Sequence, residues 1–339
     1  MLGREPSLVD ARRPLRLAAA FSGGADSLAL VAVLREFHRL GAVQLTAIHV
    51  DHGVRPESGA EAATVAEVGR RLGVDLLTVA IDPDALARHQ GVGLEEAMRR
   101  ERYRVLATIA GDLGAQVIVT GHHRRDQAET VLLHLLRGAG LRGVAGIREV
   151  SEIGVPWWPD AGTSTRMLLW RPLLGEDPEA LRAVGESLGV PIVEDPSNRS
   201  EVYRRNAVRH RVLPLLEELF PGAETNLAAF AQRAAGDDDA LDAIAIAALG
   251  DAGRRLERTR LIGQSSAVQR RMVRHWVEGE VPDAELTFDR TEAIRELTGR
   301  NQGGKTVEIG SGWRVSLRRG VLVLIPPANA EGERSGHAP

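Results

Sequence analysis

The chain has 339 residues, of which 43% are hydrophobic and 26% charged, so it can bury a sizeable core and is not a disordered polymer. It contains no cysteine, which excludes disulfides, thiolate-bound zinc or iron–sulfur clusters, and catalysis through a thiol of this chain. The formal net charge of -3 excludes a uniformly basic surface, so contact with nucleic acid would need local clusters of Arg side chains.

The first half of the chain alternates short apolar runs with amphipathic helical patterns, an order typical of a parallel α/β sheet. We expect strands over residues 15–21, 45–50, 76–81, 116–120 and 167–170. One helix is expected after the first strand, and a second opens with the capping-box pair Ser58 and Glu61. The Pro-, Gly- and Trp-containing stretch 151–166 is expected to be a long loop or an insertion.

The second half of the chain reads as mainly helical. Residues 207–220 are expected to form a helix despite Pro214, and Pro221–Gly222 ends it and marks the best domain boundary. A helical region follows, and an alternating pattern close to the end predicts a small β-hairpin or sheet. The predicted fold class is therefore α/β, a doubly wound parallel sheet with a second, smaller, mainly helical domain.

The expected domain organisation follows from these boundaries. It consists of an N-terminal extension (1–14), the sheet domain (15–206), a linker helix (207–222), a C-terminal domain (223–326) and a disordered tail (327–339). No stretch reaches the roughly 20 apolar residues needed to span a bilayer, and the start carries no apolar run ahead of a cleavage site. We expect a soluble, cytoplasmic protein without membrane contact.

A candidate phosphate-binding loop lies directly between the first predicted strand and the first predicted helix. It consists of Ser22, Gly23, Gly24, Ala25, Asp26 and Ser27. Glycines let the backbone approach a ligand, and the amides at a helix start attract anions. Asp26 would repel phosphate unless a cation intervened, so the loop predicts a nucleotide di- or triphosphate with Mg²⁺ held in part by Asp26. A Walker-type loop is excluded because no lysine lies nearby, and a glycine-rich turn with a helix cap is the alternative.

Polar side chains also follow the second predicted strand, where the chain reads HVDHGVR from His49 to Arg55. Ligands of open α/β sheets bind at the carboxyl ends of strands, so His49 and Asp51 are further candidates for the nucleotide site. Together the two segments resemble the PP-loop ATP pyrophosphatases, because SGGADS matches the SGGxDS signature of that class at every fixed position. The resemblance implies cleavage of ATP between its α- and β-phosphates, which leaves AMP on an activated oxygen.

The helix predicted over 94–113 carries charges on its apolar stripe. The apolar members of this stripe are Leu94, Met98, Val105, Ile109 and Leu113. Glu95 and Arg102 lie on the same stripe, and charges on a core-facing stripe need partners or a ligand. Ion pairing, for example between Glu95 and Arg99 at i and i+4, is the structural alternative, and it leaves Arg102 as the more exceptional residue.

A pair of acids follows the fourth predicted strand, in the segment GHHRRDQAET. Asp126 and Glu129 are one helical turn apart, a spacing that is also typical of an ordinary helix N-terminus. A functional pair would instead bind Mg²⁺ or the ammonium group of an amine substrate. His122 and His123 are adjacent rather than three or four residues apart, so we expect no zinc site.

Basic residues outnumber acids in the segment EDPSNRSEVYRRNAVRHR, which makes a local positive patch on an acidic chain. Arg and Tyr side chains grip phosphates and stack on splayed bases, as single-stranded RNA requires, whereas a solvated helix face is the alternative. The Gly-rich run from Arg137 to Gly146 would pass close to the same RNA or merely turn the chain. The candidate RNA-binding residues are Arg137, Arg142, Asn198, Arg204, Arg205, Asn206 and Arg209.

Taken in order, these segments resemble the tRNA(Ile)-lysidine synthetases over most of the chain. The motifs are SGGADS, HVDHGVR, LEEAMRRERY, GHHRRDQAET with LLRGAGLRGVAGI, RPLL, and EDPSN with Tyr203, Arg205, Asn206 and Arg209. The resemblance implies ATP-dependent ligation of free L-lysine to C2 of the wobble cytidine in the CAU anticodon of tRNA(Ile), through an adenylated cytidine. That family usually has two consecutive aspartates where this chain has Arg125–Asp126, which puts the local electrostatics in question.

The resemblance also assigns roles to the matching residues. The loop 22–27 would bind ATP with His49 and Asp51, and Asp26 would help to hold Mg²⁺. Arg102 would offset negative charge during adenylation, while Asp126 and Glu129 would receive the lysine amines. The C-terminal domain would contact the rest of the tRNA, and the family suggests a homodimer.

Other functions remain as alternatives. A tRNA thiolase of the same ATP-cleaving class also adenylates a base, but such enzymes generally carry sulfur on cysteines, which this chain lacks. Glutamine-dependent amidation is weakened in the same way, since the usual glutaminase nucleophile is a thiol. A non-catalytic RNA-binding relative is the alternative from a different class, and Arg125 is the only sequence feature that favours it.

Overall fold

A computed structural model of the chain describes residues 14–51, 58–87, 89, 91–153, 167–193, 204–282, 284–299 and 305–327. The chain divides into two compact units, and the division falls between Ala234 and Ala235 inside one long helix, beyond the Pro221–Gly222 boundary expected from the sequence. The expected extension 1–14 and tail 327–339 lie outside the described residues, apart from Pro14 and Pro327. Of the described residues, no helix is both long and apolar enough to cross a membrane.

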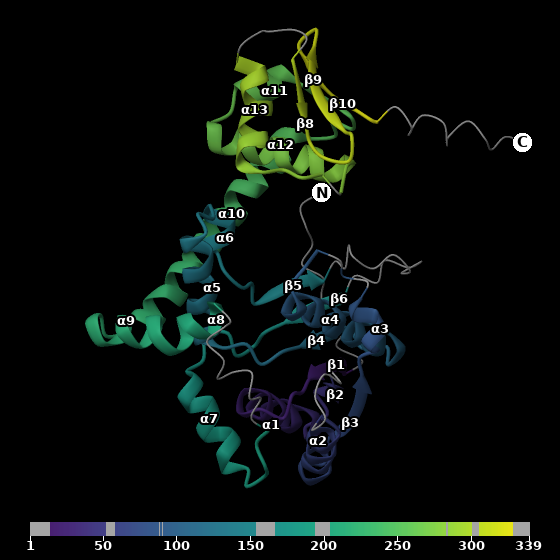
Figure 1. Cartoon of the computed structure of the whole chain (residues 1–339), viewed down its shortest axis with the longest axis vertical. Helices are drawn as coiled ribbons and strands as arrows, with labels where there is room; N and C mark the ends of the chain where they lie inside the picture. Colours follow the sequence, from purple (N-terminus) through teal and green to yellow (C-terminus); the bar gives the residue numbers. More distant parts are fainter. Residues whose placement is uncertain are drawn as a thin grey trace, which may run out of the picture. The chain divides into compact units, whose positions relative to one another are not determined.

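The first unit is built on a six-stranded sheet (Figure 1). Its strands are β1 (Leu15–Ala20), β2 (Val43–Asp51), β3 (Asp75–Ala80), β4 (Val117–Val119), β5 (Val150–Ile153) and β6 (Met167–Trp170). Their order is β3-β2-β1-β4-β6-β5, and every neighbouring pair is parallel except β5 with β6. All five predicted strands are confirmed. β5 is an antiparallel edge strand at the start of the predicted 151–166 loop, and the rest of that loop lies outside the described residues.

Helices cover both faces of this sheet, which confirms the doubly wound α/β class. They are α1 (Ala25–Arg39), α2 (Ser58–Leu72), α3 (Pro83–Leu86), α4 (Leu94–Asp112), α5 (Arg124–Leu136), α6 (Leu141–Val144) and α7 (Pro178–Ser187). Successive side chains of a strand point to opposite faces. Leu17 and Ala19 of β1 accordingly pack in a core with α1, α2 and α7, whereas Ala18 packs in a second core with α4.

The strand order creates a switch point at the carboxyl end of β1. β1 lies between β2 and β4, so the chain leaves β1 toward one side of the sheet and reaches β4 from the other. Loops diverge at such a point and leave the crevice in which open α/β sheets bind ligands. The loop that follows β1 and the segment that follows β4 therefore lie side by side.

The basic segment after residue 203 is helical, as predicted, but in three pieces. These are α8 (Arg204–Ala207), a five-residue π-helix η2 (Val208–Val212) and α9 (Leu213–Leu219). Pro214 has no N–H to donate and its ring would clash with the carbonyl four residues earlier in a regular helix. The wider π-turn immediately before α9 places Pro214 at the helix start, where it is tolerated.

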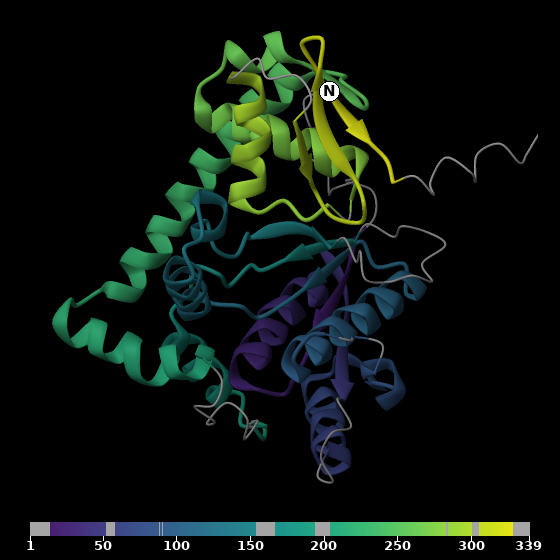
Figure 2. The ribbon, with the colours of Figure 1, turned by 45° about the horizontal axis from the view of Figure 1, so that its top comes forward.

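The second unit combines helices with a four-stranded antiparallel sheet of order β7-β10-β9-β8. Its elements are the later part of α10 (Ala223–Leu249), β7 (Arg255–Glu257), α11 (Arg258–Ile262), α12 (Ser266–Glu280), α13 (Phe288–Gly299), β8 (Thr306–Glu308), β9 (Arg314–Arg318) and β10 (Val321–Ile325). Figure 2 shows β9 and β10 side by side as the predicted closing hairpin, drawn in yellow. The unit has its own core, in which Met272, Ile294 and Val315 are fully buried.

Candidate functional site

The loop after β1 is a tight turn that hydrogen bonds from its own side chains stabilise. Gly23 adopts a φ of +81°, and a Cβ at this position would lie 2.9 Å from Cγ2 of Val65, so only glycine fits. The Ser27 hydroxyl donates to the Gly24 carbonyl at 2.9 Å, and its oxygen lies 3.2 Å from the Ser22 hydroxyl. The result is a tight strand-to-helix turn at the positive end of α1, which is a geometry suited to phosphate.

The end of β2 supports this loop. His49 is buried, and its Nδ1 lies 2.9 Å from the carbonyl oxygen of Phe21, the residue just before the loop. Asp51 is the last residue of β2 and is half-buried. His52 to Arg55 of the HVDHGVR motif lie outside the described residues.

His123 links the phosphate loop to the acid pair. Gly121, after β4, approaches the loop so closely that a Cβ there would lie 3.1 Å from the Asp26 carbonyl oxygen. The Nε2 atom of the buried His123 is 3.5 Å from the Asp26 carboxylate and 3.6 Å from that of Asp126. Burial lowers the pKa of His123, but its hydrogen bond to Asp26 and the charge of Asp126 outweigh burial and raise it above the usual value.

Asp126 and Glu129 both lie in the first turns of α5, as the sequence predicts, and both are buried. The Asp126 carboxylate accepts a hydrogen bond from the His123 backbone N–H at 3.0 Å, so it also caps the helix. Asp126 therefore serves as a helix cap, which was the structural alternative, and it is also a candidate for binding a substrate amine.

Two arginines from the basic segment contact this acid pair, which the sequence did not indicate. Arg205 donates to Asp126 at 2.9 Å and to Glu129 at 2.7 Å. Arg209 donates to the same two carboxylates, at 3.1 Å to Asp126 and at 2.5 Å to Glu129. Candidate RNA-binding and candidate lysine-binding residues thus form one network of four charges.

The network lowers the pKa of Asp126. Burial raises the pKa of Asp126, but the positive charges of His123, Arg205 and Arg209 outweigh burial and lower the pKa to about 2. Burial is the main cause that lowers the pKa of His122 to about 3, so its ring, 2.8 Å from the Thr120 hydroxyl, is neutral near pH 7. Asp126 is therefore ionised at neutral pH, and the imidazole of His122 is neutral.

Arg102 lies on helix α4. The residues that α4 buries differ from the apolar stripe predicted from the sequence. Leu94 is 54% exposed, so its assignment to the core-facing stripe is wrong, and the side chain of Glu95 lies outside the description. Arg102 is half-buried with its guanidinium over the Tyr103 ring, 5.5 Å from the centroid. Burial and the positive charges of Arg99 and Arg205 lower its pKa, while Tyr103 opposes the shift.

The buried acid of α4 is Glu101, which the stripe did not single out. It is 2% exposed and pairs with His89 at 2.7 Å and with Arg104 at 2.5 Å. This is a structural ion pair of the kind weighed for Glu95. Helical spacing alone missed it because His89 comes from the segment between α3 and α4.

Arg125, the departure from the family pattern, is turned away from the acid pair. Its guanidinium donates to Glu224 of α10 at 2.7 Å and to Glu179 of α7 at 2.6 Å. Burial lowers its pKa, but the two carboxylates outweigh burial and raise it further. Arg125 therefore ties α5 to α7 and α10, and its charge is balanced there.

The residues beside the phosphate loop are suited to a metal ion that binds together with the phosphates of a nucleotide. No group of three His, Asp or Glu side chains in the described part of the chain could hold a metal ion. Mg²⁺ commonly binds through one or two carboxylates together with substrate phosphates, and the Asp26 side chain is 43% exposed beside the loop. One accessible carboxylate at a phosphate loop meets that requirement.

The remaining candidate RNA-binding residues differ in how exposed their side chains are. Arg137, Arg142 and Arg204 are exposed. Asn206 is 8% exposed, so it lies inside the fold rather than on the surface. Asn198 lies outside the described residues.

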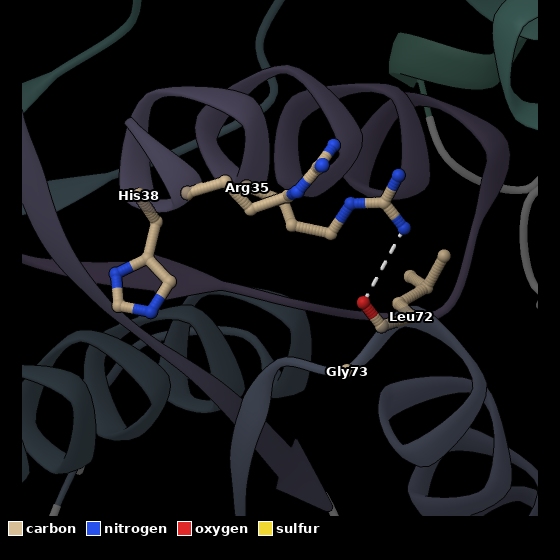
Figure 3. A pocket seen from close by; sticks show the side chains of 5 residues that line it. Arg35, His38, Leu72 and Gly73 are labelled. Atoms are coloured by element: carbon tan, nitrogen blue, oxygen red, sulfur yellow. Dashed lines mark hydrogen bonds between the residues drawn. The ribbon is translucent and has the colours of Figure 1, made fainter. Parts of the chain in front are cut away.

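A separate hollow of about 380 Å³ lies between the C-terminal ends of α1 and α2 (Figure 3). Figure 3 shows Arg35 reaching across it to the carbonyl of Leu72, at 3.3 Å. Arg35 and Arg39 both pair with the single carboxylate of Glu36. The hollow is at the opposite end of α1 from the phosphate loop, roughly 20 Å along the helix, and is not part of the site.

A parallel sheet with a glycine- and serine-rich phosphate loop after its first strand defines an ATP-using α/β protein of the PP-loop class, and the PP-loop domain family matches residues 5–216. The tRNA(Ile)-lysidine synthase of Parasynechococcus marenigrum is 34% identical over 329 residues, which cover 96% of this chain and 93% of that protein. That of Salinispora tropica is 38% identical over 330 residues, covering 95% of this chain and 94% of that protein. The chain therefore belongs to the tRNA(Ile)-lysidine synthase family of PP-loop proteins.

Other relatives of the same name are longer. The tRNA(Ile)-lysidine synthase of Thermus thermophilus is 36% identical over 317 residues, which cover 92% of this chain but 57% of that protein. The chain thus spans about half to two thirds of the length of several curated relatives that it matches.

Among solved structures, the fold is similar to that of the U34-tRNA thiolase NcsA from Methanococcus maripaludis with its [4Fe-4S] cluster. The TM-score is 0.54 at 16% sequence identity, over 68% of this chain and 76% of that one. This likeness concerns the fold alone. This chain has no cysteine, so it has no thiolate ligand for an iron–sulfur cluster.

Proposed function

We propose that this protein ligates free L-lysine to C2 of the wobble cytidine of a CAU-anticodon tRNA(Ile), with cleavage of ATP to AMP and pyrophosphate. The observation that carries the proposal is the position of His123 between the Asp26 and Asp126 carboxylates, at 3.5 Å and 3.6 Å. An ATP-binding loop and an amine-binding acid pair have to share one crevice if both act on the same base.

In the first step, O2 of the cytidine attacks the α-phosphate of ATP, and pyrophosphate leaves. The amides of the loop 22–27 and the N-terminus of α1 would stabilise the charge of the leaving pyrophosphate. Asp26 would help to hold Mg²⁺, which neutralises phosphate charge when bound with ATP. Arg102 would offset negative charge on the adenylated base, and His49 and Asp51 would shape or contact the nucleotide site.

In the second step, the ε-ammonium of lysine first loses a proton to water, and the neutral amine then attacks C2 of the cytidine. The C2–O2 bond breaks as AMP leaves with that oxygen. The buried Asp126 and Glu129 would receive lysine ammonium groups and orient the nucleophile. With its pKa lowered to about 2, Asp126 is a poor proton acceptor at neutral pH, which suits a role in binding charge better than general base catalysis.

The RNA would lie over the exposed arginines of the first unit. Arg137, Arg142 and Arg204 offer forked donors to phosphates, and Asn198 and Asn206 belong to the same motif. The second unit would contact the body of the tRNA. We further propose that the protein is cytoplasmic and forms a homodimer.

The structural position of Arg125 weakens the non-catalytic alternative. Its charge is balanced by Glu179 and Glu224 rather than directed at Asp126, so it takes no part in the ion pairs of the two acids. The sequence feature that favoured a binding protein without turnover therefore has a structural explanation.

The test is to incubate the protein with Mg-ATP, L-lysine and a CAU-anticodon tRNA(Ile) transcript. Pyrophosphate release reports the first step, and AMP release with the mass of the digested nucleosides reports the second. We expect a lysine-sized mass gain at the wobble cytidine. Asp126→Asn should lower lysidine formation on the order of 100-fold with less effect on pyrophosphate release, because a buried charge partner of the amine is lost.

Asp112→Asn is the matched control, because Asp112 is an exposed aspartate at the end of α4. It should leave both steps unchanged. If tRNA binds but neither pyrophosphate nor a modified cytidine is formed, the enzymatic proposal is wrong and a binding protein is the better description.

A further inference from the structure

Every carboxylate oxygen of the acid pair already accepts at least one hydrogen bond in this structure. Both oxygens of Glu129 accept from Arg205 or Arg209, and its side chain is 0% exposed. One oxygen of Asp126 accepts from both arginines, and the other accepts from the His123 backbone N–H. The acids are almost fully buried while the two arginines bonded to them are more exposed, so an ammonium group reaches the pair only if an arginine moves aside.

The charges of the network balance as it stands. Two buried carboxylates face two guanidinium groups, and removing one guanidinium would leave an uncompensated buried negative charge, which is strongly unfavourable. A single ammonium group from lysine restores that balance. One arginine and one lysine ammonium are thus alternative partners of the same acids.

The side chains of Arg205 and Arg209 are partly exposed, so RNA could contact them. Their side chains are 32% and 26% exposed, respectively, although the acids beneath them are almost fully buried. They lie on the segment α8–η2 beside the exposed Arg204. A guanidinium forms bidentate hydrogen bonds with phosphate as readily as with carboxylate, so an arriving backbone phosphate competes directly for these groups.

We propose that Arg205 and Arg209 form a latch that closes the lysine site until tRNA is bound. A phosphate of the anticodon region draws at least one of the two guanidiniums from Asp126 and Glu129, and the lysine ammonium takes its place on the acids. This inference rests on the proposed function. It adds an order of binding, in which RNA comes before the productive binding of lysine.

The direct test measures lysine affinity by isothermal titration calorimetry on the full chain. Mg²⁺ and α,β-methylene-ATP are present throughout, because this analogue cannot be cleaved at the bond that the reaction breaks. L-lysine is titrated with and without a saturating CAU-anticodon tRNA(Ile) transcript. We expect RNA to tighten lysine binding at least tenfold, and equal affinities in the two conditions would overturn the latch.

Arg209→Gln tests the same idea without RNA, since it removes one of the two cations from the acids. We expect this variant to bind lysine at least tenfold more tightly than the unmodified protein when RNA is absent. Arg70→Gln is the matched control, because Arg70 is an exposed arginine of α2 that pairs with Glu67, and it should change nothing in that condition. A thermal unfolding scan checks that both variants are folded, and the comparison with and without RNA needs no variant.

The two proposals fail in different ways. If the unmodified protein forms lysidine but binds lysine equally well with and without RNA, the latch is wrong and the proposed function stands. If neither pyrophosphate nor lysidine is formed, the proposed function fails, and the latch fails with it.

Discussion

Arg125 shows how one residue can depart from a family pattern without disturbing the site next to it. The family resemblance leads one to expect an aspartate at this position. The arginine is instead satisfied by Glu179 and Glu224, the second of which is 8% exposed. Its partners lie on α7 and α10, far along the chain, so sequence inspection could not supply them.

Restoring the family residue should therefore destabilise this protein. Arg125→Asp would place an acid between two others and leave the buried Glu224 without this cation, at a cost of about 2–3 kcal/mol in the free energy of unfolding. Chemical denaturation measures the loss. Arg182→Asp, which creates a similar clash with Glu186 at an exposed pair, should cost less than about 1 kcal/mol. Equal costs for the two variants would show that the Arg125 contacts do not matter.

Ionised Asp126 should contribute to the free energy of unfolding, and this contribution should be lost at low pH. Its pKa is about 2 in the folded protein against an ordinary 3.8, so the stability it contributes is complete above pH 4 and is lost as pH falls toward 2. The difference in unfolding free energy between the unmodified protein and Asp126→Asn should shrink by about 1 kcal/mol between pH 5 and pH 3. A difference that stays constant over this range would contradict the assigned ion pairs.

Single residues were predictable from sequence where the chemistry is local. The phosphate loop and the Asp126–Glu129 pair rest on short spacings and on their place after a strand. The contacts of Arg205 with the same acids join residues 76 and 79 positions apart, and no periodicity reaches that far. This long-range pairing is the main feature of the site that sequence could not indicate.

At the scale of elements, the contact between α7 and the start of α1 controls the phosphate loop. A Cβ at Gly185 of α7 would lie 3.1 Å from the carbonyl oxygen of Ala25, the first residue of α1. That neighbour is backbone, which cannot rotate away. Gly185 therefore lets α7 pack closely against the end of the helix that faces the nucleotide.

Gly185→Ala should push these two helices apart and weaken nucleotide binding. We expect the Kd for Mg-ATP to rise roughly tenfold and stability to fall by about 1–3 kcal/mol, as for an overpacked core position. Gly236→Ala is the control, since Gly236 is an exposed residue inside α10 and a Cβ there meets nothing within 4 Å. It should leave nucleotide binding unchanged and stabilise the helix by up to about 1 kcal/mol.

Element type was predictable wherever the apolar pattern extends over a whole strand or helix. β5 and β7 were missed, because they have four and three residues and owe their conformation to pairing with β6 and β10. The π-turn of η2 is likewise a response to Pro214 and to packing against α5. Short elements of this kind are defined by their neighbours rather than by their own sequence.

At the scale of the whole molecule, each unit has core packing of its own, and among the described elements only α10 belongs to both units. The first unit is organised around the sheet, and the second around residues such as Met272 and Ile294. The division lies next to Gly236, the residue of α10 with the lowest helix propensity. A helix with its weak point at a unit boundary permits each core to unfold without the other.

Hydrogen exchange resolved by segment should detect this independence. Met272→Ala removes a fully buried side chain and should lower protection in α12 and β9 by the equivalent of about 2–5 kcal/mol, with no change in β1 or β4. Mg²⁺ with α,β-methylene-ATP at about 100 times its Kd should raise protection in β1 and β4 by about 2.7 kcal/mol and leave β9 unaffected. The ligand acts on the first unit and the mutation on the second, so each should change hydrogen-exchange protection in one unit alone. Protection that rises or falls together in both units would instead mean that α10 couples the two cores into a single unfolding transition.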